Sequence, residues 1–234
     1  VNLTGKNKAK RLTERFGEFD YVGNSRIDIE VWKQAKGAWV VGSKNLQREA
    51  GKHCEVLRNF DPPKLTFKVL RKALRMHQWA KNLLIFLPML LAHKYFEGWF
   101  WMRCILAFLS FSCISSSVYV FNDLLDIESD RRHPDNKNRA FAAGNLSIVK
   151  GLLLTPLLLG IGFGLGYYLS TEYFYVVVGY FALTCLYSLR LKRIVMADII
   201  VLSLLYTWRL FAGGVATETM LTEWFLTFAM FFFL

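Results

Sequence analysis

The chain contains few cysteines and no paired cysteine motif. Its four cysteines among 234 residues are Cys54, Cys104, Cys113 and Cys185, and no two of them have the spacing C-x-x-C. Three of them lie inside apolar runs. This pattern argues against a disulfide framework and against a zinc site, both of which need grouped cysteines. We interpret the four cysteines as small side chains of a packed interior.

Charge is almost absent from several long segments of the chain. Residues 151–170 and 173–189 contain no Asp, Glu, Lys or Arg, and residues 99–121 contain only Arg103. Residues 194–216 contain only Asp198 and Arg209. A helix needs about 20 apolar residues to cross a bilayer. We therefore expect an all-α integral membrane protein with four full spans, a short span at 82–93 and the start of a sixth at 224–234.

The basic residues are concentrated in a few segments. The net charge is +11, which in a soluble domain would suggest nucleic acid, but here the bases flank the apolar runs. Residues 64–81 hold six bases, residues 122–150 hold five and residues 190–193 hold three, whereas the other loops hold only Lys94. Lys and Arg prefer cytoplasmic loops. This alternation predicts a multi-pass protein of the inner or plasma membrane, with the N-terminal piece and all three basic segments on the cytoplasmic side and no nucleic-acid partner.

The composition divides the chain into three parts. Residues 1–60 are predicted to form a small α/β piece, with a basic helix at 5–19, a turn at 23–25 followed by a helix, and a buried strand at 38–42. Residues 61–81 begin with a proline linker and continue as a basic amphipathic helix over 64–81, which suits a membrane surface. Residues 82–234 form the membrane domain. Since the chain begins with Val1 and ends inside an apolar run, we expect it to be cut from a longer protein at both ends.

The densest charge cluster lies at residues 122–139, directly after an apolar run, and contains five acids and four bases. Asp123, Asp126 and Asp130 would share one face of a helix that continues from the membrane. Carboxylate oxygens suit Mg²⁺, which often takes substrate phosphates as further ligands, and Asn122 adds a neutral oxygen. The bases that follow suit phosphate oxygens; they are Arg131, Arg132, Lys137 and Arg139. The cluster therefore predicts a diphosphate held through Mg²⁺, and the alternative is a solvated loop of paired charges.

Two further polar groups are expected near the same membrane face. The charge cluster at 122–139 is the first polar group. Residues 187–198 provide a second polar group, which contains Tyr187, Arg190, Lys192 and Asp198. Asp198 and Arg209 are about three helical turns apart, so they would share a helix face toward a cavity, or form an intramembrane ion pair. Residues 75–82 provide the third group, in which Lys81 either meets substrate or only anchors the interface together with Trp79.

Three separated motifs resemble one enzyme family. NDLLDIESDR at 122–131 matches NDxxDxxxD, the first aspartate-rich motif of the UbiA superfamily of intramembrane prenyltransferases. HQWAKN, DRRHPDNKNRAFAAGNLS and YSLRLKRIVMADI resemble the branch that contains decaprenyl-phosphate phosphoribosyltransferase. The resemblance covers residues 70–234 and implies a bundle of nine transmembrane helices around a cavity, about six of them in this chain. Two departures are Ala140, where the family's RPxxA has proline, and Met76, which replaces a proline before HQW.

The resemblance and the charge pattern together give a set of expected site residues. The cofactor is Mg²⁺, and its expected ligands are Asn122, Asp123, Asp126 and Asp130. The expected catalytic residues are Asp123, Asp126, Tyr187 and Asp198. The expected binding residues for substrate phosphates are Lys81, Arg131, Lys137, Arg139, Arg190, Lys192 and Arg209.

The N-terminal piece resembles the C-terminal end of a haloacid-dehalogenase-like phosphatase domain. YVGNSRIDIEVW resembles its last acidic motif, with Asn24 where aspartate is common and with Asp28 retained, and Lys8 matches its lysine motif. The nucleophile motif DxDxT is absent from this sequence. We therefore assign no phosphatase activity to these residues.

The sequence leaves three functions open. The leading hypothesis is a Mg²⁺-dependent transfer of 5-phosphoribose from phosphoribosyl diphosphate to a polyprenyl phosphate in the membrane. The alternative is a transfer of a polyprenyl group from its diphosphate to an aromatic or other acceptor, with the same metal site. A third possibility is a lipid or ion transporter, in which broken helices would bind the cargo near Asp198 and Arg209.

Overall fold

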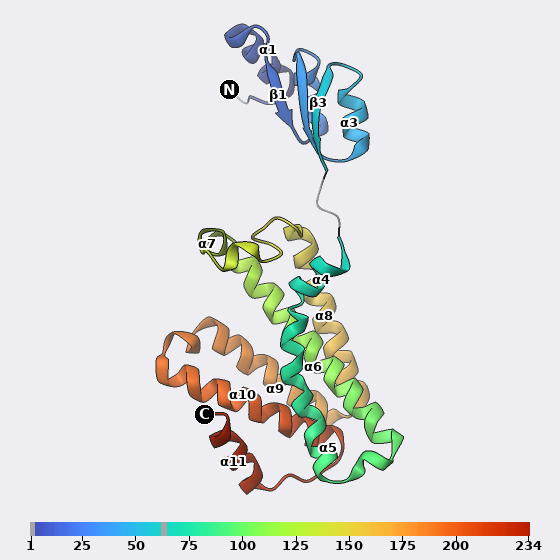
Figure 1. Ribbon diagram of the computed structural model, residues 1–234, viewed down its shortest axis with the longest axis vertical. Coiled ribbons are helices and arrows are strands. Elements are labelled where there is room, and N and C mark those ends of the chain that lie inside the picture. The colour runs from blue at the N-terminus through green and yellow to red at the C-terminus, as the bar shows by residue number, and fades with distance from the viewer. Residues whose placement is uncertain (1–2, 62–64) are drawn as a thin grey trace. The chain divides into compact units, whose positions relative to one another are not determined.

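The computed structural model describes residues 3–61 and 65–234, without the side chains of Arg193 and Val195. The chain divides into two compact units, Val1–Lys64 and Leu65–Leu234. Figure 1 shows the helices and strands of each unit.

The N-terminal unit is a small parallel sheet flanked by helices. Its elements in order are α1 (Gly5–Phe16), β1 (Asp20–Gly23), η1 (Arg26–Asp28), α2 (Ile29–Trp32), β2 (Gly37–Val41), α3 (Lys44–Ala50) and β3 (Glu55–Phe60). The strands pair in the order β1-β2-β3. Trp32 is fully buried beside Ala38, Val40 and Ala50. The predicted helix at 5–19 and strand at 38–42 correspond to α1 and β2, whereas β1, α3 and β3 had not been predicted.

Four long apolar helices make up most of the second unit. They are α6 (Gly98–Leu125), α8 (Ile148–Leu169), α9 (Thr171–Leu189) and α10 (Val195–Ala216), and each is long and apolar enough to cross a membrane. These helices confirm the four predicted full spans. A shorter apolar helix follows, α11 (Glu223–Phe232).

The segment before α6 differs from its prediction. A basic helix was expected over 64–81, but α4 covers only Phe67–Ala73 and Arg75 adopts a left-handed conformation with φ of 48°. The 3₁₀ helix η2 (Met76–Phe86), the short α5 (Leu87–Leu91) and η3 (Lys94–Phe96) follow, so residues 82–93 are not one regular span. Tertiary contacts account for the break, because Ser116 donates to the carbonyl of Leu74 and Arg75 turns to meet Asp123.

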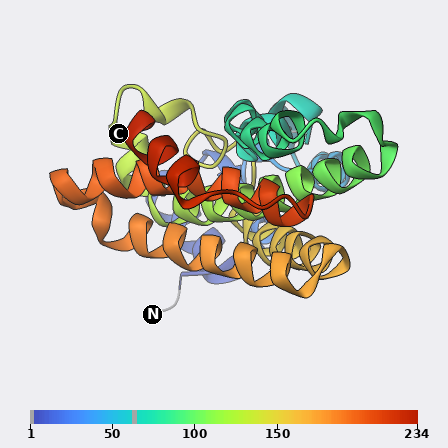
Figure 2. The same ribbon diagram turned by 90° about the horizontal axis from the view of Figure 1, so that it is seen from below.

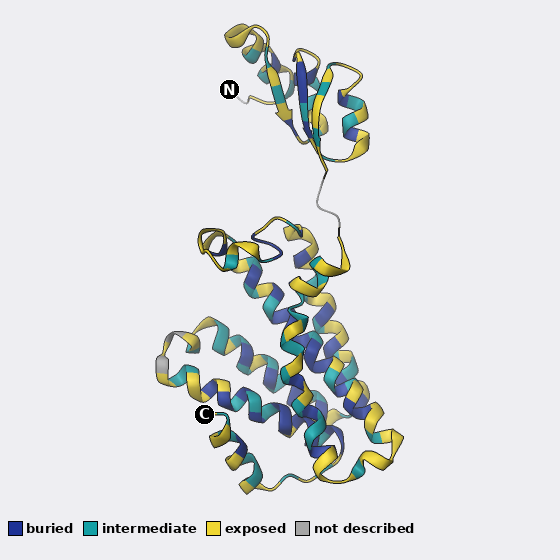
Figure 3. Ribbon diagram, in the orientation of Figure 1, coloured by how far each residue is buried: buried dark blue, intermediate teal, exposed yellow. Residues whose placement is uncertain are grey.

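Helix α6 lies at the centre of the membrane unit. It packs along α8, and α9 packs along α10 (Figures 1 and 2). The apolar part of α6 is mostly buried, whereas few residues of α8 and α9 are buried (Figure 3). A Cβ at Gly213 of α10 would overlap the carbonyl oxygen of Ile85, so this glycine allows η2 to lie directly against α10. The close packing positions polar side chains of η2, α6, α9 and α10 around a shared space.

Candidate active site

Polar side chains from η2, α6, α9, α10 and the connecting segments that contain Arg139 and Lys192 converge on one pocket of the membrane unit, which we call the charged pocket. Its cavity volume is about 210 Å³. It brings together eight of the predicted site residues: Lys81, Asn122, Asp123, Asp126, Arg139, Tyr187, Lys192 and Arg209. It is also lined by polar residues that had not been predicted: Arg75, Tyr119, Tyr180, Thr184, Ser188 and Tyr206.

Asp123 is the most deeply placed carboxylate of the charged pocket. It lies in the last turn of α6 and is 3% exposed. Its Oδ1 accepts a hydrogen bond from Nη2 of Arg75 at 2.5 Å and lies 3.4 Å from Nη1 of Arg139. A buried carboxylate needs such partners because it has lost its water. Two guanidinium groups therefore hold Asp123 at the end of the helix.

Asp130 does not join the other two aspartates in the pocket, which corrects the prediction of one continuous acidic face. Helix α6 ends at Leu125, Asp126 takes φ of −95° and ψ of 9°, and a new helix α7 begins (Ile127–Arg132). Asp130 is buried and both of its oxygens accept from Nη1 of Arg139, at 2.9 and 2.8 Å. Arg139 thus links Asp123 to Asp130, and only Asp123 and Asp126 line the charged pocket.

Three of the predicted phosphate-binding residues also lie outside the charged pocket. Arg131 is exposed, and its Nε donates to the carbonyl of Ala142 at 3.2 Å, which holds the loop after α7. Lys137, in the 3₁₀ turn η4 (Asn136–Asn138), and Arg190, at the end of α9, are exposed. None of these three side chains lines the charged pocket. Charge pattern alone did not distinguish bases that face the pocket from bases that face solvent.

Tyr187 and Asp198 are brought together from different helices. The Tyr187 hydroxyl donates to Oδ1 of Asp198 at 2.7 Å. Tyr187 lines the charged pocket, whereas Asp198 stands behind it as its hydrogen-bond acceptor. Among the ion pairs of the described residues none joins Asp198 to Arg209, so the alternative of an intramembrane ion pair is not found, and the shared helix face stays a prediction.

Arg209 is buried within α10 and holds three elements together. It is 5% exposed. Its Nε donates to Oδ1 of Asn82 at 2.9 Å, and its Nη2 donates to the hydroxyl of Tyr180 at 3.0 Å. Asn82 in turn donates to Ser112 at 2.9 Å. These neutral partners fix the guanidinium at the wall of the charged pocket.

The unpredicted polar residues gave weak signals in the sequence. Arg75 was one of six bases of a segment read as an interfacial helix, so nothing singled it out as a partner of Asp123. Tyr180 and Tyr206 lie inside apolar runs, where an aromatic side chain looks like packing. Their place in the pocket depends on how the helices cross.

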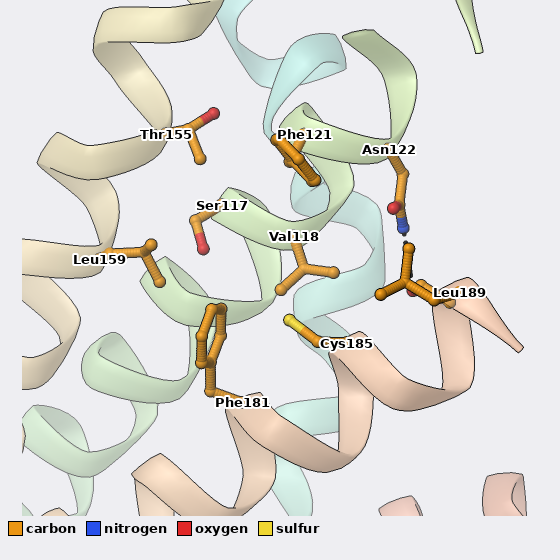
Figure 4. A pocket seen from close by; sticks show the side chains of 10 residues that line it. Ser117, Val118, Phe121, Asn122, Thr155, Leu159, Phe181, Cys185 and Leu189 are labelled. Atoms are coloured by element: carbon orange, nitrogen blue, oxygen red, sulfur yellow. Dashed lines mark hydrogen bonds between the residues drawn. The ribbon is translucent and has the colours of Figure 1, made fainter. Parts of the chain in front are cut away.

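An apolar pocket adjoins the charged one. Its cavity volume is about 210 Å³, and it is enclosed by α6, α8 and α9 (Figure 4). Val118, Phe121 and Phe181 supply apolar walls. Asn122 and Ser188 line both pockets, and Nδ2 of Asn122 donates to Oγ of Ser188 at 3.0 Å. This hydrogen bond lies between the charged pocket and the apolar pocket, at the end of the membrane helices.

The donor set fits Mg²⁺ in part. Among the described residues no three His, Cys, Asp or Glu side chains are grouped as a metal cluster would need. Asp123 and Asp126 nevertheless line one pocket with Asn122, whose amide nitrogen is turned to Ser188. Two carboxylates and an amide oxygen suit a cation that completes its shell with water and phosphate oxygens.

A second polar pocket lies in the N-terminal unit, with a cavity volume of about 420 Å³. Nζ of Lys8 donates to the Tyr21 hydroxyl at 2.6 Å, and that hydroxyl donates to Asp28 at 3.0 Å. Asp28 also accepts from the backbone amides of Asn24 and Ser25, both at 3.0 Å. Burial would raise the pKa of Asp28, but these hydrogen bonds outweigh burial and lower it. The likeness to a haloacid-dehalogenase domain stays a prediction.

The family model described as the UbiA prenyltransferase family matches residues 83–234. The uncharacterized protein y4nM of Sinorhizobium fredii is 36% identical over 100% of this chain and 46% of its own length. The nodulation protein NoeC of Azorhizobium caulinodans is 34% identical over 71% of this chain and 54% of its length. The decaprenyl-phosphate phosphoribosyltransferase of Mycolicibacterium smegmatis is 34% identical over 70% of this chain and 53% of its length. The chain thus spans about half the length of the curated relatives it matches.

A solved structure shares the fold of the membrane unit. It is a UbiA homolog from Archaeoglobus fulgidus bound to GPP and Mg²⁺, with a TM-score of 0.58 and 18% identity, and the match covers 70% of this chain and 59% of the homolog. The family match covers most of the membrane unit, including α6, α8, α9 and α10, whereas Arg75 and Lys81 of the charged pocket lie just before it. The chain therefore belongs to the UbiA prenyltransferase family and is an integral membrane protein.

Proposed function

We propose that the protein transfers 5-phosphoribose from phosphoribosyl diphosphate to a polyprenyl phosphate, with Mg²⁺ as cofactor. One observation carries the proposal: five cations and only two carboxylates line a pocket at the end of membrane helices. Such an excess of positive charge suits a reaction whose two substrates both carry phosphates. Relatives named decaprenyl-phosphate phosphoribosyltransferase, at 34% and 35% identity, support the same assignment.

In this proposal the carboxylate end of the charged pocket takes the diphosphate. Asp126, Asp123 and the amide oxygen of Asn122 would hold Mg²⁺, which when bound neutralises charge that develops on the departing diphosphate. Arg139 and Lys192 line the same pocket and would bind the phosphate oxygens directly. Asp198 fixes the orientation of the Tyr187 hydroxyl by accepting a hydrogen bond from it.

The proposed chemistry exchanges one carbon–oxygen bond for another. The bond from the anomeric carbon to diphosphate breaks, and its electron pair leaves with the diphosphate. An oxygen of the lipid phosphate then bonds to the cation-like anomeric carbon. Since a phosphate monoester is largely ionised at neutral pH, no proton has to be removed from the attacking oxygen. The carboxylates are therefore needed for binding and orientation rather than as a general base.

A specific observation favours one alternative, the transfer of a polyprenyl group to an aromatic or other acceptor. Four tyrosines line the charged pocket, and aromatic faces stabilise a nearby cation such as an allylic one. The Archaeoglobus homolog with the same fold binds GPP and Mg²⁺. An aromatic carbon that is attacked must lose a proton, so this reaction would need a base that phosphoribosyl transfer does not need.

We also propose that the charged pocket opens toward the cytoplasm and that the N-terminal unit lies on the same side. The distribution of Lys and Arg along the chain supports this orientation, because the basic segments 64–81, 122–150 and 190–193 all belong to one face in an alternating topology.

The test uses the protein reconstituted in liposomes with Mg²⁺. Radiolabelled phosphoribosyl diphosphate is supplied with a polyprenyl phosphate, and label is measured in the lipid phase. We expect labelled lipid. If label stays in the water phase while polyprenyl diphosphate and an aromatic acid give product, the prenyl-transfer alternative replaces the proposal.

A further inference from the structure

Two cations of the charged pocket, Lys81 and Arg209, lie near the same aromatic ring and have no carboxylate partner among the described residues. The guanidinium carbon of Arg209 lies 5.4 Å from the centre of the Tyr206 ring, and Nζ of Lys81 lies 5.6 Å from the centre of the same ring. Both side chains line the pocket. No ion pair of the described residues includes either of them. Two like charges near one ring repel each other, and an anion that binds both would offset this repulsion.

The partners of Arg209 are all neutral. They are the amide oxygen of Asn82, the hydroxyl of Tyr180 and the carbonyl of Leu205. Hydrogen bonds of this kind satisfy donors but do not neutralise a buried charge. An intramembrane arginine without a counter-ion is costly, and such residues usually face a substrate path.

The surrounding residues hold this end of the pocket in a fixed shape. The amide of Asn82 donates to Ser112 at 2.9 Å, so its oxygen is turned to Arg209. The Tyr180 hydroxyl also lies 3.1 Å from Oγ of Ser115. Both serines belong to α6, the central helix. The guanidinium is therefore positioned before any ligand arrives, which lowers the entropy lost on binding.

The other part of the pocket contains the carboxylates Asp123 and Asp126. There Asp123 is neutralised by Arg75 and Arg139, and Asp126 and Asn122 offer oxygens to a cation. An anion would reach that end through a metal ion. Among the described residues no carboxylate pairs with Lys81 or Arg209, so an anion would bind these two side chains directly.

We infer that Lys81 and Arg209 form a phosphate-monoester subsite that works without metal, separate from the carboxylate end of the charged pocket. The inference rests on the proposed function, in which each co-substrate carries one phosphate monoester: the lipid phosphate, or the 5-phosphate of the sugar. A monoester has nearly two negative charges, which matches the two cations.

Equilibrium binding without turnover tests the subsite. Ribose 5-phosphate and geranyl phosphate are titrated separately into the reconstituted protein in the presence of EDTA. We expect at least one of them to bind, and its dissociation constant to rise about tenfold in Lys81→Gln, a loss of about 1.4 kcal/mol. Lys150→Gln, which removes an exposed lysine at the start of α8, should bind as the parent does.

Arg209→Lys provides a second variant, because it keeps the charge but loses the planar fork that contacts Asn82 and Tyr180. It should also weaken binding while the protein stays folded. Among the described residues no side-chain hydrogen bond includes Lys81, so Lys81→Gln reports on binding even if Arg209→Lys unfolds. Stronger binding of geranyl phosphate assigns the subsite to the lipid, and stronger binding of ribose 5-phosphate assigns it to the sugar.

The inference is overturned if neither probe binds without Mg²⁺, or if binding is unchanged in both folded variants. This result would differ from failure of the proposed function. Absence of label transfer to lipid, together with metal-free binding that Lys81→Gln weakens, would keep the subsite and reject the phosphoribosyl reaction.

Discussion

Single side chains decide how the charge cluster at 122–139 folds. The sequence predicted three aspartates on one face. In the structure Asp130 instead pairs with Arg139 and does not line the charged pocket. Sequence reasoning found the residue types and missed their pairing, because a cation that follows acids in the chain can bind phosphate or neutralise its neighbours. The choice depends on the loop that brings Arg139 back onto α7.

The Arg139 link gives a prediction at this scale. Arg139→Gln leaves Asp130 buried without its charged partner, which should cost about 3 kcal/mol and loosen the loop at 127–146. The backbone amides of that loop should exchange their hydrogens faster, because the ion pair that holds the loop is lost. Arg132→Gln is the matched control, since Arg132 is exposed on α7.

Combining the change with Asp130→Asn distinguishes pairing from simple loss of a side chain. The double variant should lose less stability than the sum of the two single variants, because Asn leaves no buried charge. Additive losses would contradict the role given to this ion pair.

Asp28 predicts a pH dependence in the N-terminal unit. Its pKa is lowered because hydrogen bonds from Asn24, Ser25 and Tyr21 outweigh its burial. A carboxyl with a lowered folded pKa stabilises the fold above its unfolded pKa of about 3.9, and this stability is lost as the pH falls through the folded value.

The backbone amides of Asn24 and Ser25, which donate to Asp28, should therefore lose protection from hydrogen exchange as the pH falls below about 4. In Asp28→Asn the same amides should show little change with pH once intrinsic exchange rates are corrected. Equal acid sensitivity in both proteins would contradict this assignment.

At the scale of elements, the sequence predicted the long helices well and the irregular segment poorly. The apolar runs at 99–121, 151–170, 173–189 and 194–216 became α6, α8, α9 and α10, because an apolar run of about 20 residues has no better structure in a bilayer. The break at Arg75 and the 3₁₀ helix η2 follow instead from contacts with α6 and α10 that lie far away in the sequence.

Close contact between η2 and α10 predicts a large effect of one methyl group. In Gly213→Ala the new Cβ would overlap the carbonyl oxygen of Ile85 and lie 2.9 Å from its carbonyl carbon. Backbone atoms cannot move aside as a flexible side chain would, so we expect a loss of about 3 kcal/mol, measured as a lower thermal midpoint in detergent.

Gly160→Ala is the matched control in α8, where an added Cβ meets nothing within 4 Å. It should leave the midpoint unchanged or raise it, since alanine favours a helix by about 0.5–1 kcal/mol over glycine. Similar destabilisation by both changes would show that η2 does not lie directly on α10.

At the scale of the whole molecule, the motifs located the site because three distant segments converge. Residues 75–82, 122–139 and 187–198 all contribute to the charged pocket, together with α10. Which bases of each segment face the pocket was not predictable, because the loops after α7 and α9 place Arg139 and Lys192 inside and Arg131, Lys137 and Arg190 outside. The central claim is that the carboxylates of this pocket support transfer to a lipid.

The most direct test of this claim measures the transfer of radiolabel from phosphoribosyl diphosphate to polyprenyl phosphate in liposomes. The parent protein is compared with the variants Asp126→Asn and Glu128→Gln. Asp126 lines the charged pocket, whereas Glu128 is an exposed acid two residues away on α7. We predict that Asp126→Asn lowers Mg²⁺-dependent transfer by about 100-fold and that Glu128→Gln transfers as the parent does. Equal activity of all three proteins at limiting Mg²⁺ would contradict the account.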